Sequence, residues 1–148
     1  MLRTRASIAA AALMTLVLTA CASAEPTVTL KGESFRVVIA EDAETQARGL
    51  MFVDHMDADA GMLFVYPDSG RRSFWMRNCR IPLDILYFNE SAELVGEALG
   101  VPPCNANQCP TYDGGGAPAR YILELNAGVA KSLGVTRGDK LTLPEAVK

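Results

Sequence analysis

The sequence predicts a mainly β, α+β fold: a small, partly closed β-barrel with two short helices. Three observations support this. Short apolar runs separated by turn residues recur along the chain, and only two segments have helical spacing. Hydrophobic residues make up 49% of the 148 residues, enough for a packed core. The length suits one domain, which we assign to residues 27–148.

Residues 1–21 have the features of a lipoprotein signal peptide. Two arginines precede the apolar run Ile8 to Leu18, which is too short for a stable membrane span. The next residues, Leu18-Thr19-Ala20-Cys21, resemble the bacterial lipobox. We therefore expect lipidation of Cys21, a tether over residues 22–26, and a location in the bacterial cell envelope on its periplasmic side. Ordinary signal cleavage a few residues later, without a lipid, is the alternative.

The charge balance disfavours nucleic acid as a partner. Without the leader, the chain has 12 basic residues against 17 acidic ones, a net charge of −5. No basic stripe remains that could neutralise a row of phosphates. The expected partners are the membrane, through the lipid anchor, and a small ligand or another envelope protein.

The first expected elements are two strands joined by a tight turn. Apolar and polar residues alternate over residues 28–30 and again over residues 35–39, on either side of Gly32-Glu33.

A helix is expected next because the apolar spacing changes. Asp42 can cap its start, and apolar residues then recur at helical spacing from Ala43 to Met51. Gly49 suggests an early end, which places Arg48 in the last turn, where a cation interacts favourably with the helix dipole.

The middle of the chain predicts four further strands. Residues 62–66 form a continuous apolar strand, and residues 73–76 a shorter one. The segment Leu83 to Phe88 is apolar on both faces apart from Asp84, so we expect it to be buried on two sides. Residues 94–101 return as its hairpin partner.

The longest irregular region spans residues 102–118. Cys104 and Cys109 lie close together in it, and the oxidising envelope permits a disulfide between them. Cys79 is then left over, and we expect a buried, inert thiol.

The C-terminal part combines a strand, a helix and a strand. Residues 120–126 alternate, with Tyr121, Leu123 and Leu125 on one face and Glu124 on the other. Asn126 is the expected cap of a helix over residues 127–133, and a last strand covers residues 140–143.

Five short blocks, in order and at sensible spacing, give the chain a resemblance to the domain-of-unknown-function 192 family. The resemblance implies a small β-rich fold and an envelope location, with no established activity and no catalytic residues. Many members have Thr where this chain has Cys79. The blocks are Arg48-Gly49-Leu50-Met51-Phe52, Gly61-Met62-Leu63-Phe64, Phe74-Trp75-Met76-Arg77-Asn78, Ile81-Pro82-Leu83-Asp84-Ile85, and Tyr121 to Leu125 with Ala127-Gly128.

Within these blocks, five residues form a candidate ligand pocket: Arg48, Trp75, Asn78, Asp84 and Glu124. Asp84 and Glu124 lie on apolar strands, where an unpaired carboxylate is costly to bury. Each therefore needs a partner, and the planar guanidinium of Arg48 suits a carboxylate. Two interpretations are open: these groups orient a small polar ligand, or they form an internal ion pair or backbone cap. Trp75 itself is expected to be an anchor in the core.

We therefore expect a binding module rather than an enzyme, with no cofactor and no metal assigned. One alternative is an envelope hydrolase that uses Asp84 and Glu124 as acid and base. Another is a copper protein that uses sulfur ligands of the methionine-rich segment from Met51 to Met76, together with His55. The apolar setting of these methionines is also typical of ordinary core residues.

Overall fold

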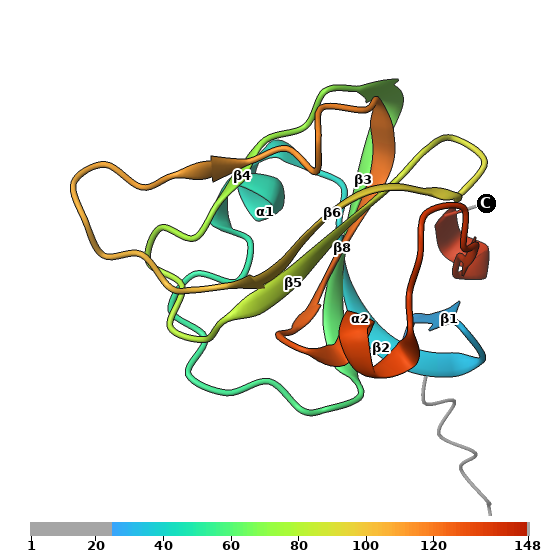
Figure 1. Cartoon of the computed structure of the whole chain (residues 1–148), viewed down its shortest axis with the longest axis horizontal. Helices are drawn as coiled ribbons and strands as arrows, with labels where there is room; N and C mark the ends of the chain where they lie inside the picture. Colours follow the sequence, from blue (N-terminus) through green and yellow to red (C-terminus); the bar gives the residue numbers. More distant parts are fainter. Residues whose placement is uncertain (1–24, 148) are drawn as a thin grey trace, which may run out of the picture.

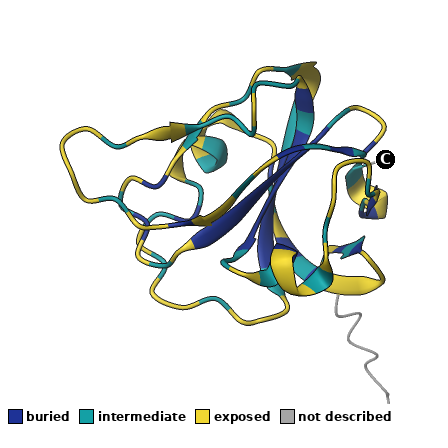
Figure 2. Cartoon of the chain, viewed as in Figure 1, coloured by how far each residue is buried: buried dark blue, intermediate teal, exposed yellow. Residues whose placement is uncertain are grey.

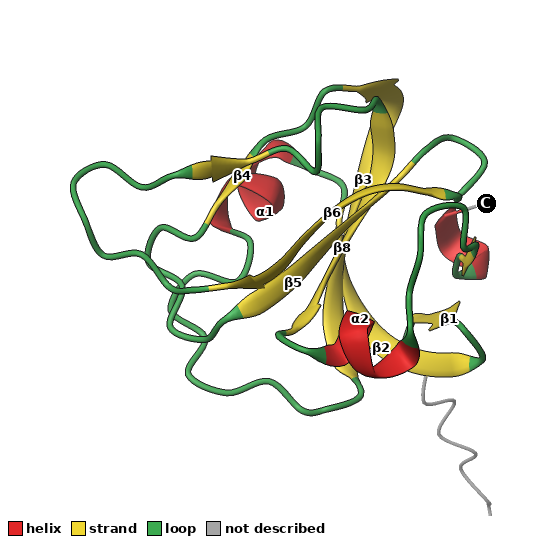
Figure 3. Ribbon diagram, in the orientation of Figure 1, coloured by secondary structure: helices red, strands yellow, loops and turns green. Residues whose placement is uncertain are grey.

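The computed structural model describes residues 25–147, so the expected leader and the lipid site at Cys21 lie outside the described residues. Strands dominate, with two short α-helices that lie apart from each other (Figures 1 and 3). The elements are β1 (Thr27–Leu30), β2 (Glu33–Ala40), α1 (Ala43–Arg48), β3 (Ala60–Gly70), β4 (Phe74–Trp75), β5 (Leu83–Phe88), β6 (Leu94–Val101), β7 (Thr111–Tyr112), β8 (Ala119–Asn126), α2 (Val129–Leu133), β9 (Leu141–Thr142) and the 3-10 helix η1 (Glu145–Val147).

Seven strands form one curled sheet in the order β6-β5-β8-β3-β2-β1-β9. Within it, β2 and β3 are parallel, and α1 lies in the crossover that a parallel pair requires. The curl brings the two ends of the sheet together: Leu94 N donates to Asp139 O (2.8 Å), and Leu141 N donates to Ala92 O (2.9 Å). The sheet is therefore a half-barrel, as the sequence predicts.

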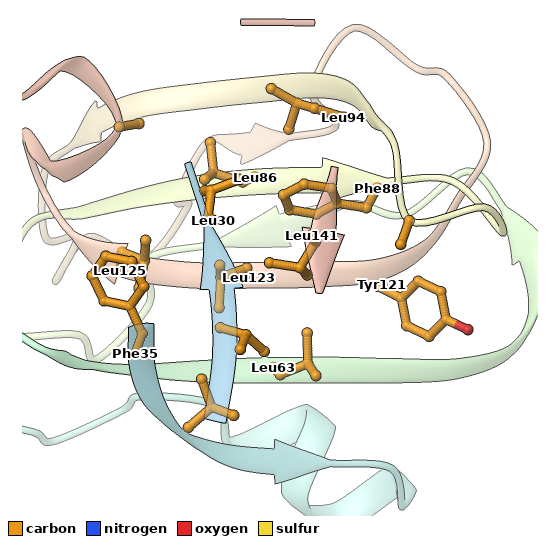
Figure 4. Close-up of a cluster of buried hydrophobic side chains, with 14 residues drawn as sticks. Leu30, Phe35, Leu63, Leu86, Phe88, Leu94, Tyr121, Leu123, Leu125 and Leu141 are labelled. Carbon is orange, nitrogen blue, oxygen red and sulfur yellow. The ribbon is translucent and has the colours of Figure 1, made fainter. Parts of the chain in front are cut away.

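The inner face of the curl holds one hydrophobic core, to which strands from every part of the sheet contribute (Figure 4). Leu123 and Leu125 of β8 point into it beside Leu86 and Phe88 of β5. These strands alternate, so their other residues point to the outer face. That face is also covered. All six residues of β5 are buried, which confirms the expected two-sided burial, and β5 and β8 form the dark centre of Figure 2.

The outer face is covered by a second core. It contains Phe64, Ile85 and Ile122 from the sheet, and Leu50 and Met76 from the segments that lie over it. The short β4–β7 ribbon and α1 belong to this cover, on the left of Figure 1. The outer face is thus largely buried as well, and a polar side chain that points into it loses most of its contact with water.

The long region over residues 102–118 is more ordered than the sequence predicts, because it contains β7. The expected disulfide between Cys104 and Cys109 is confirmed. The backbone of Cys104 is tied to the segment after β4: its N–H donates to Met76 O (3.0 Å), and its carbonyl accepts from Asn78 N (3.2 Å). A two-residue strand carries too little periodicity to be recognised from sequence.

The first helix matches its expected signals. Asp42 Oδ1 accepts a hydrogen bond from Thr45 N (2.9 Å), and Gly49 ends the helix with a backbone φ of 49°. Arg48 lies in the last turn, as expected.

The expected cap of the second helix is wrong. Asn126 does not cap it; its amide instead donates to the carbonyls of Met56 and Asp57 (both 3.0 Å). The helix begins later, after Gly128, and the carboxylate of Asp84 on β5 accepts from Ala130 N (2.9 Å). A distant strand thus supplies the cap, which local sequence signals do not reveal.

We predict that Asp84→Ala destabilises the fold by about 2–4 kcal/mol. The two oxygens of Asp84 accept from Gly100 N (2.8 Å) and Ala130 N (2.9 Å), and the substitution leaves both N–H groups without that partner. Urea unfolding measures the loss. Asp54→Ala is the control, because the Asp54–Arg80 pair is exposed and its removal should cost about 0–1 kcal/mol. Equal losses in the two variants would refute the capping role.

Candidate functional site

Glu124 is the polar group on the buried outer face of the sheet. It lies on β8 between Ile85 of β5 and Met62 of β3, each directly opposite it in the strand register. The residue is 4% exposed, and its Oε2 has no hydrogen-bond partner among the described residues. A buried carboxyl oxygen without a partner is costly, so its presence requires an explanation.

A narrow cleft leads from the surface to Glu124. Its volume is about 30 Å³, room for one or two water molecules or the end of a slender chain. The walls are apolar and include Leu50, Phe64 and Phe74. Arg48 and Trp75, both exposed, also line it. We call this feature the Glu124 cleft.

The helix α1 forms one side of the Glu124 cleft and is fixed to the sheet. Gln46 Nε2 donates to Val65 O (2.9 Å) and to Ala40 O (3.3 Å), which bridges the edges of β2 and β3. The glycine at the end of α1 also lies close to the sheet: a Cβ at Gly49 would be 3.4 Å from the ring of Phe64. The position of Arg48 is therefore set by a helix with two anchors.

The electrostatics of the cleft favour protonated groups. Burial raises the pKa of Glu124 from 4.5 to about 8, so the carboxyl is mostly neutral at pH 7. Burial, and then the charge of Glu124, raise the pKa of Cys79 to about 11. The same two causes, in the same order, raise the pKa of Tyr87, whose hydroxyl donates to Tyr112 O (2.7 Å). Cys79 therefore remains a thiol, and the base of the cleft is uncharged but polar.

The structure brings together three of the five residues proposed from sequence: Arg48, Trp75 and Glu124 line one cleft. Asp84 is not with them. It lies opposite Leu125, on the inner face, whereas Glu124 lies opposite Ile85 on the outer face. The two carboxyls are therefore on opposite sides of the sheet and cannot flank one substrate.

Asn78 lies outside the lining of the Glu124 cleft, in the neighbouring loop. Its backbone carbonyl accepts from Phe52 N (2.8 Å), and its side chain is 3.8 Å from the sulfur of Met51. Both Asn78 and Phe52 have positive φ values, 58° and 66°. Asn tolerates this conformation, but a bulky residue such as Phe rarely adopts it. The segment beside the cleft is thus held in an unusual shape, with Phe52 exposed.

Two expectations about the site were wrong. Trp75 is 46% exposed rather than an anchor of the core, and the guanidinium of Arg77 lies 5.6 Å from its ring centroid. Arg48 forms no ion pair with either proposed carboxylate; within residues 25–147, neither the Asp84 contacts nor the Glu124 contacts include it. The internal ion pair is therefore not formed, whereas the backbone cap, the other form of that interpretation, is confirmed for Asp84.

Sequence reasoning missed most of the other residues that line the Glu124 cleft, among them Gln46, Phe64, Phe74 and Cys79. Phe64 and Phe74 were assigned to strands without a role, and Gln46 has the pattern of an ordinary helix surface. Cys79 was correctly expected to be a buried free thiol. No local signal indicates that these residues meet, because they come from segments up to 33 positions apart that the sheet assembles.

A second, wider hollow adjoins the cleft. Its volume is about 280 Å³, and its lining is mainly apolar, with Val38, Val53 and Met62 among its residues. It shares the segment from Arg48 to Met51 with the Glu124 cleft, so this segment separates the two.

The positions of the methionines and of His55 give little support to the copper alternative. Met51 and Met62 line the same hollow, but His55 is exposed and lies 3.4 Å from Asp57. Across residues 25–147, no three or more His, Cys, Asp or Glu side chains are grouped as metal ligands would be.

In the same part of the chain, no helix has the length and hydropathy to cross a membrane.

The family model DUF192, with the description "Uncharacterized ACR", matches residues 26–143. The chain belongs to the DUF192 family. A solved structure from Sinorhizobium meliloti 1021, described as a proposed transcription regulator, is 32% identical with a TM-score of 0.70; the match covers 80% of this chain and 92% of that one. A protein of unknown function from Novosphingobium aromaticivorans DSM 12444 is 31% identical with a TM-score of 0.68, covering 86% and 99%. No match was found among proteins with curated descriptions.

We predict that Glu124→Gln removes a pH dependence of stability from this DUF192 domain. The folded state holds the Glu124 proton more tightly than the unfolded state, because the pKa rises from 4.5 to about 8 on burial. Wild-type stability should therefore fall as pH rises between these values, by at most about 1.4 kcal/mol per pH unit. Gln cannot ionise, so the stability of the variant relative to the wild type should increase as pH rises from 4.5 to about 8.

Urea unfolding at a series of pH values from about 5 to about 8 measures this difference. Glu97→Gln, an exposed carboxyl on β6, is the control and should keep the wild-type slope. A Glu124→Gln slope equal to that of the wild type would contradict the prediction.

Proposed function

We propose that this DUF192 protein is a lipid-anchored envelope module that binds a small polar ligand at the Glu124 cleft. One observation carries the proposal: Glu124 is 4% exposed, its Oε2 has no hydrogen-bond partner among residues 25–147, and the residue lines a cleft that reaches the surface. A ligand group that hydrogen-bonds to Glu124 would remove the cost of burying it. The exposed aromatic and cationic side chains of Trp75 and Arg48 would contact the rest of the ligand.

Binding fits the cleft better than catalysis does. General acid–base hydrolysis needs a second group beside Glu124, and the other proposed carboxylate, Asp84, is on the opposite face. The titratable neighbours Cys79 and Tyr87 have raised pKa values, so both hold their protons at neutral pH. A carboxyl group at the base of an apolar cleft is well suited to recognise a polar group, as a donor when neutral and as an acceptor when ionised.

The envelope location rests on the sequence, supported by one structural feature. The disulfide between Cys104 and Cys109 is expected in an oxidising compartment. In the sequence, Cys21 also lies only four residues before Glu25, whose carboxylate forms an ion pair with Arg36 (3.3 Å). A lipid on Cys21 would therefore keep the domain close to the membrane surface. The net charge of −5 without the leader disfavours nucleic acid as the partner.

A ligand screen tests the binding site. The full-length protein is purified in detergent and followed by the fluorescence of Trp75, the one Trp of the chain, which lines the cleft. The screen includes metals, sugars, small acids and amines, and binding should also raise the unfolding temperature. Glu124→Leu removes the polar anchor and should abolish the response. Glu97→Gln should retain it.

The outcomes separate the alternatives. A ligand whose binding depends on Glu124 supports the proposal. Hits that survive Glu124→Leu would place the ligand elsewhere and contradict it, and a screen without any hit would favour a protein partner instead.

We also predict a lipid on Cys21. Mass spectrometry of the mature protein from membranes should show a diacylglycerol-modified N-terminal Cys21. An unmodified N-terminus at Ala22 or Glu25 would refute the lipid anchor.

A further inference from the structure

We infer that the ligand of the Glu124 cleft is an unbranched ω-amino acid, with its primary ammonium group against Glu124 and its carboxylate beside Arg48. This inference rests on the proposed function, because it takes the cleft to be the ligand site. It adds the chemical class of the ligand, including the sign of the charge at each end.

The two ends of the cleft have groups whose ionised forms are of opposite sign. The inner end has the carboxyl of Glu124, whose Oε2 has no partner among residues 25–147, and the thiol of Cys79, which keeps its proton because its pKa is raised to about 11. The outer end has Arg48, which is exposed and has no carboxylate partner among residues 25–147. The other arginines close to the sheet are paired: Arg36, Arg71, Arg72, Arg80 and Arg120 each form an ion pair with Asp or Glu.

A second cation strengthens the positive outer end. The guanidinium of Arg77 lies 5.6 Å from the ring centroid of Trp75, and it too has no carboxylate partner in the described chain. Arg48 and Arg77, both without a carboxylate partner among residues 25–147, thus lie near the exposed indole of Trp75. A free carboxylate on the ligand would be the complement that the protein itself does not provide.

The volume of the cleft and the residues that line it indicate which chemical groups can lie between the two ends of the ligand. Phe64, Phe74 and Leu50 supply apolar surface, which suits methylene groups and disfavours hydroxyls. A volume of about 30 Å³ admits only the end of a slender, unbranched chain, so the rest of the ligand would lie towards the exposed side chains of Arg48 and Trp75. A ligand that is charged at both ends and apolar between them matches the order of these groups along the cleft: the carboxyl, the apolar walls and the arginines.

The ionisation of Glu124 gives the inference a distinctive pH dependence. An ammonium group is bound best by the carboxylate form, so Glu124 must release its proton on binding. Its pKa is raised to about 8 by burial, whereas an alkyl ammonium keeps its proton up to about pH 10. Affinity should therefore rise about tenfold per pH unit below 8 and level off above it. A ligand that accepts a hydrogen bond from neutral Glu124 would show the reverse, with affinity falling above pH 8.

Fluorescence titration of full-length protein in detergent tests the inference with three matched probes. ε-Aminocaproate carries both charged ends, caproate lacks the amine, and hexylamine lacks the carboxylate. We expect ε-aminocaproate to bind about 10- to 100-fold more tightly than either of the others, the range expected for one charge-assisted contact. Its affinity should rise with pH from 6 until the pH reaches the pKa of Glu124, which is about 8.

Two variants assign the ends of the ligand. Arg48→Gln should weaken ε-aminocaproate to the level of hexylamine while leaving hexylamine unchanged. Glu124→Gln keeps a hydrogen-bonding side chain but no charge, and should abolish binding of both amines. Arg137→Gln, which removes an unpaired arginine outside the cleft, is the control and should change neither affinity.

The results also separate this inference from the proposed function. If caproate binds as well as ε-aminocaproate, or affinity falls above pH 8, the ω-amino acid is refuted, although a Glu124-dependent ligand site remains. If hexylamine equals ε-aminocaproate and Arg48→Gln has no effect, the carboxylate assignment is refuted. If neither amine binds, the inference is overturned, whatever the wider ligand screen finds.

Discussion

The burial of β5 and β8 on both faces is the constraint on which the rest of the structure depends. A strand alternates its side chains, so one face of β8 must serve the inner core and the other must be covered separately. The curl of the sheet closes over the inner face, and α1 with the β4–β7 ribbon covers the outer one. Glu124 points to the covered outer face, and its isolation from water follows from its position in the strand.

The same alternation separates the two buried acids and gives them different roles. Asp84 faces inward and accepts from two backbone N–H groups, so its charge is compensated within the fold. Glu124 faces outward, and its Oε2 has no donor among residues 25–147, so burial makes its carboxyl a weaker acid. Two residues with the same functional group thus become a structural cap and a candidate binding group, because they lie one position apart in the strand register.

Sequence reasoning predicted what depends on local pattern. The alternation of β8, the apolar run of β5, the cap at Asp42 and the disulfide at Cys104 and Cys109 were all readable, because each uses adjacent or closely spaced residues. Two predictions, the cap of α2 and the burial of Trp75, were wrong for the same reason. The cap of α2 comes from a strand 46 residues earlier, and the exposure of Trp75 depends on what covers β4. Neither is encoded in the residues nearby.

The candidate site was predicted in part for the same reason. The apolar residues on either side of Glu124 in the sequence predict a buried carboxyl, and this prediction needs only neighbouring residues. Whether Arg48 compensates that carboxyl depends on how α1 is set against the sheet, which only the fold determines. The structure leaves the two groups in one cleft without pairing them, and this gap is the basis of the proposed ligand site.

The most direct test of this account is the ionisation of Glu124 itself. Carbon-13 NMR can follow the side-chain carboxyl through a pH titration, with Glu124→Gln to assign the signal. The account predicts a midpoint near 8 in the free protein. A midpoint near the ordinary value of 4.5 would show that the carboxyl is solvated or already paired, and would contradict the claim that it awaits a ligand.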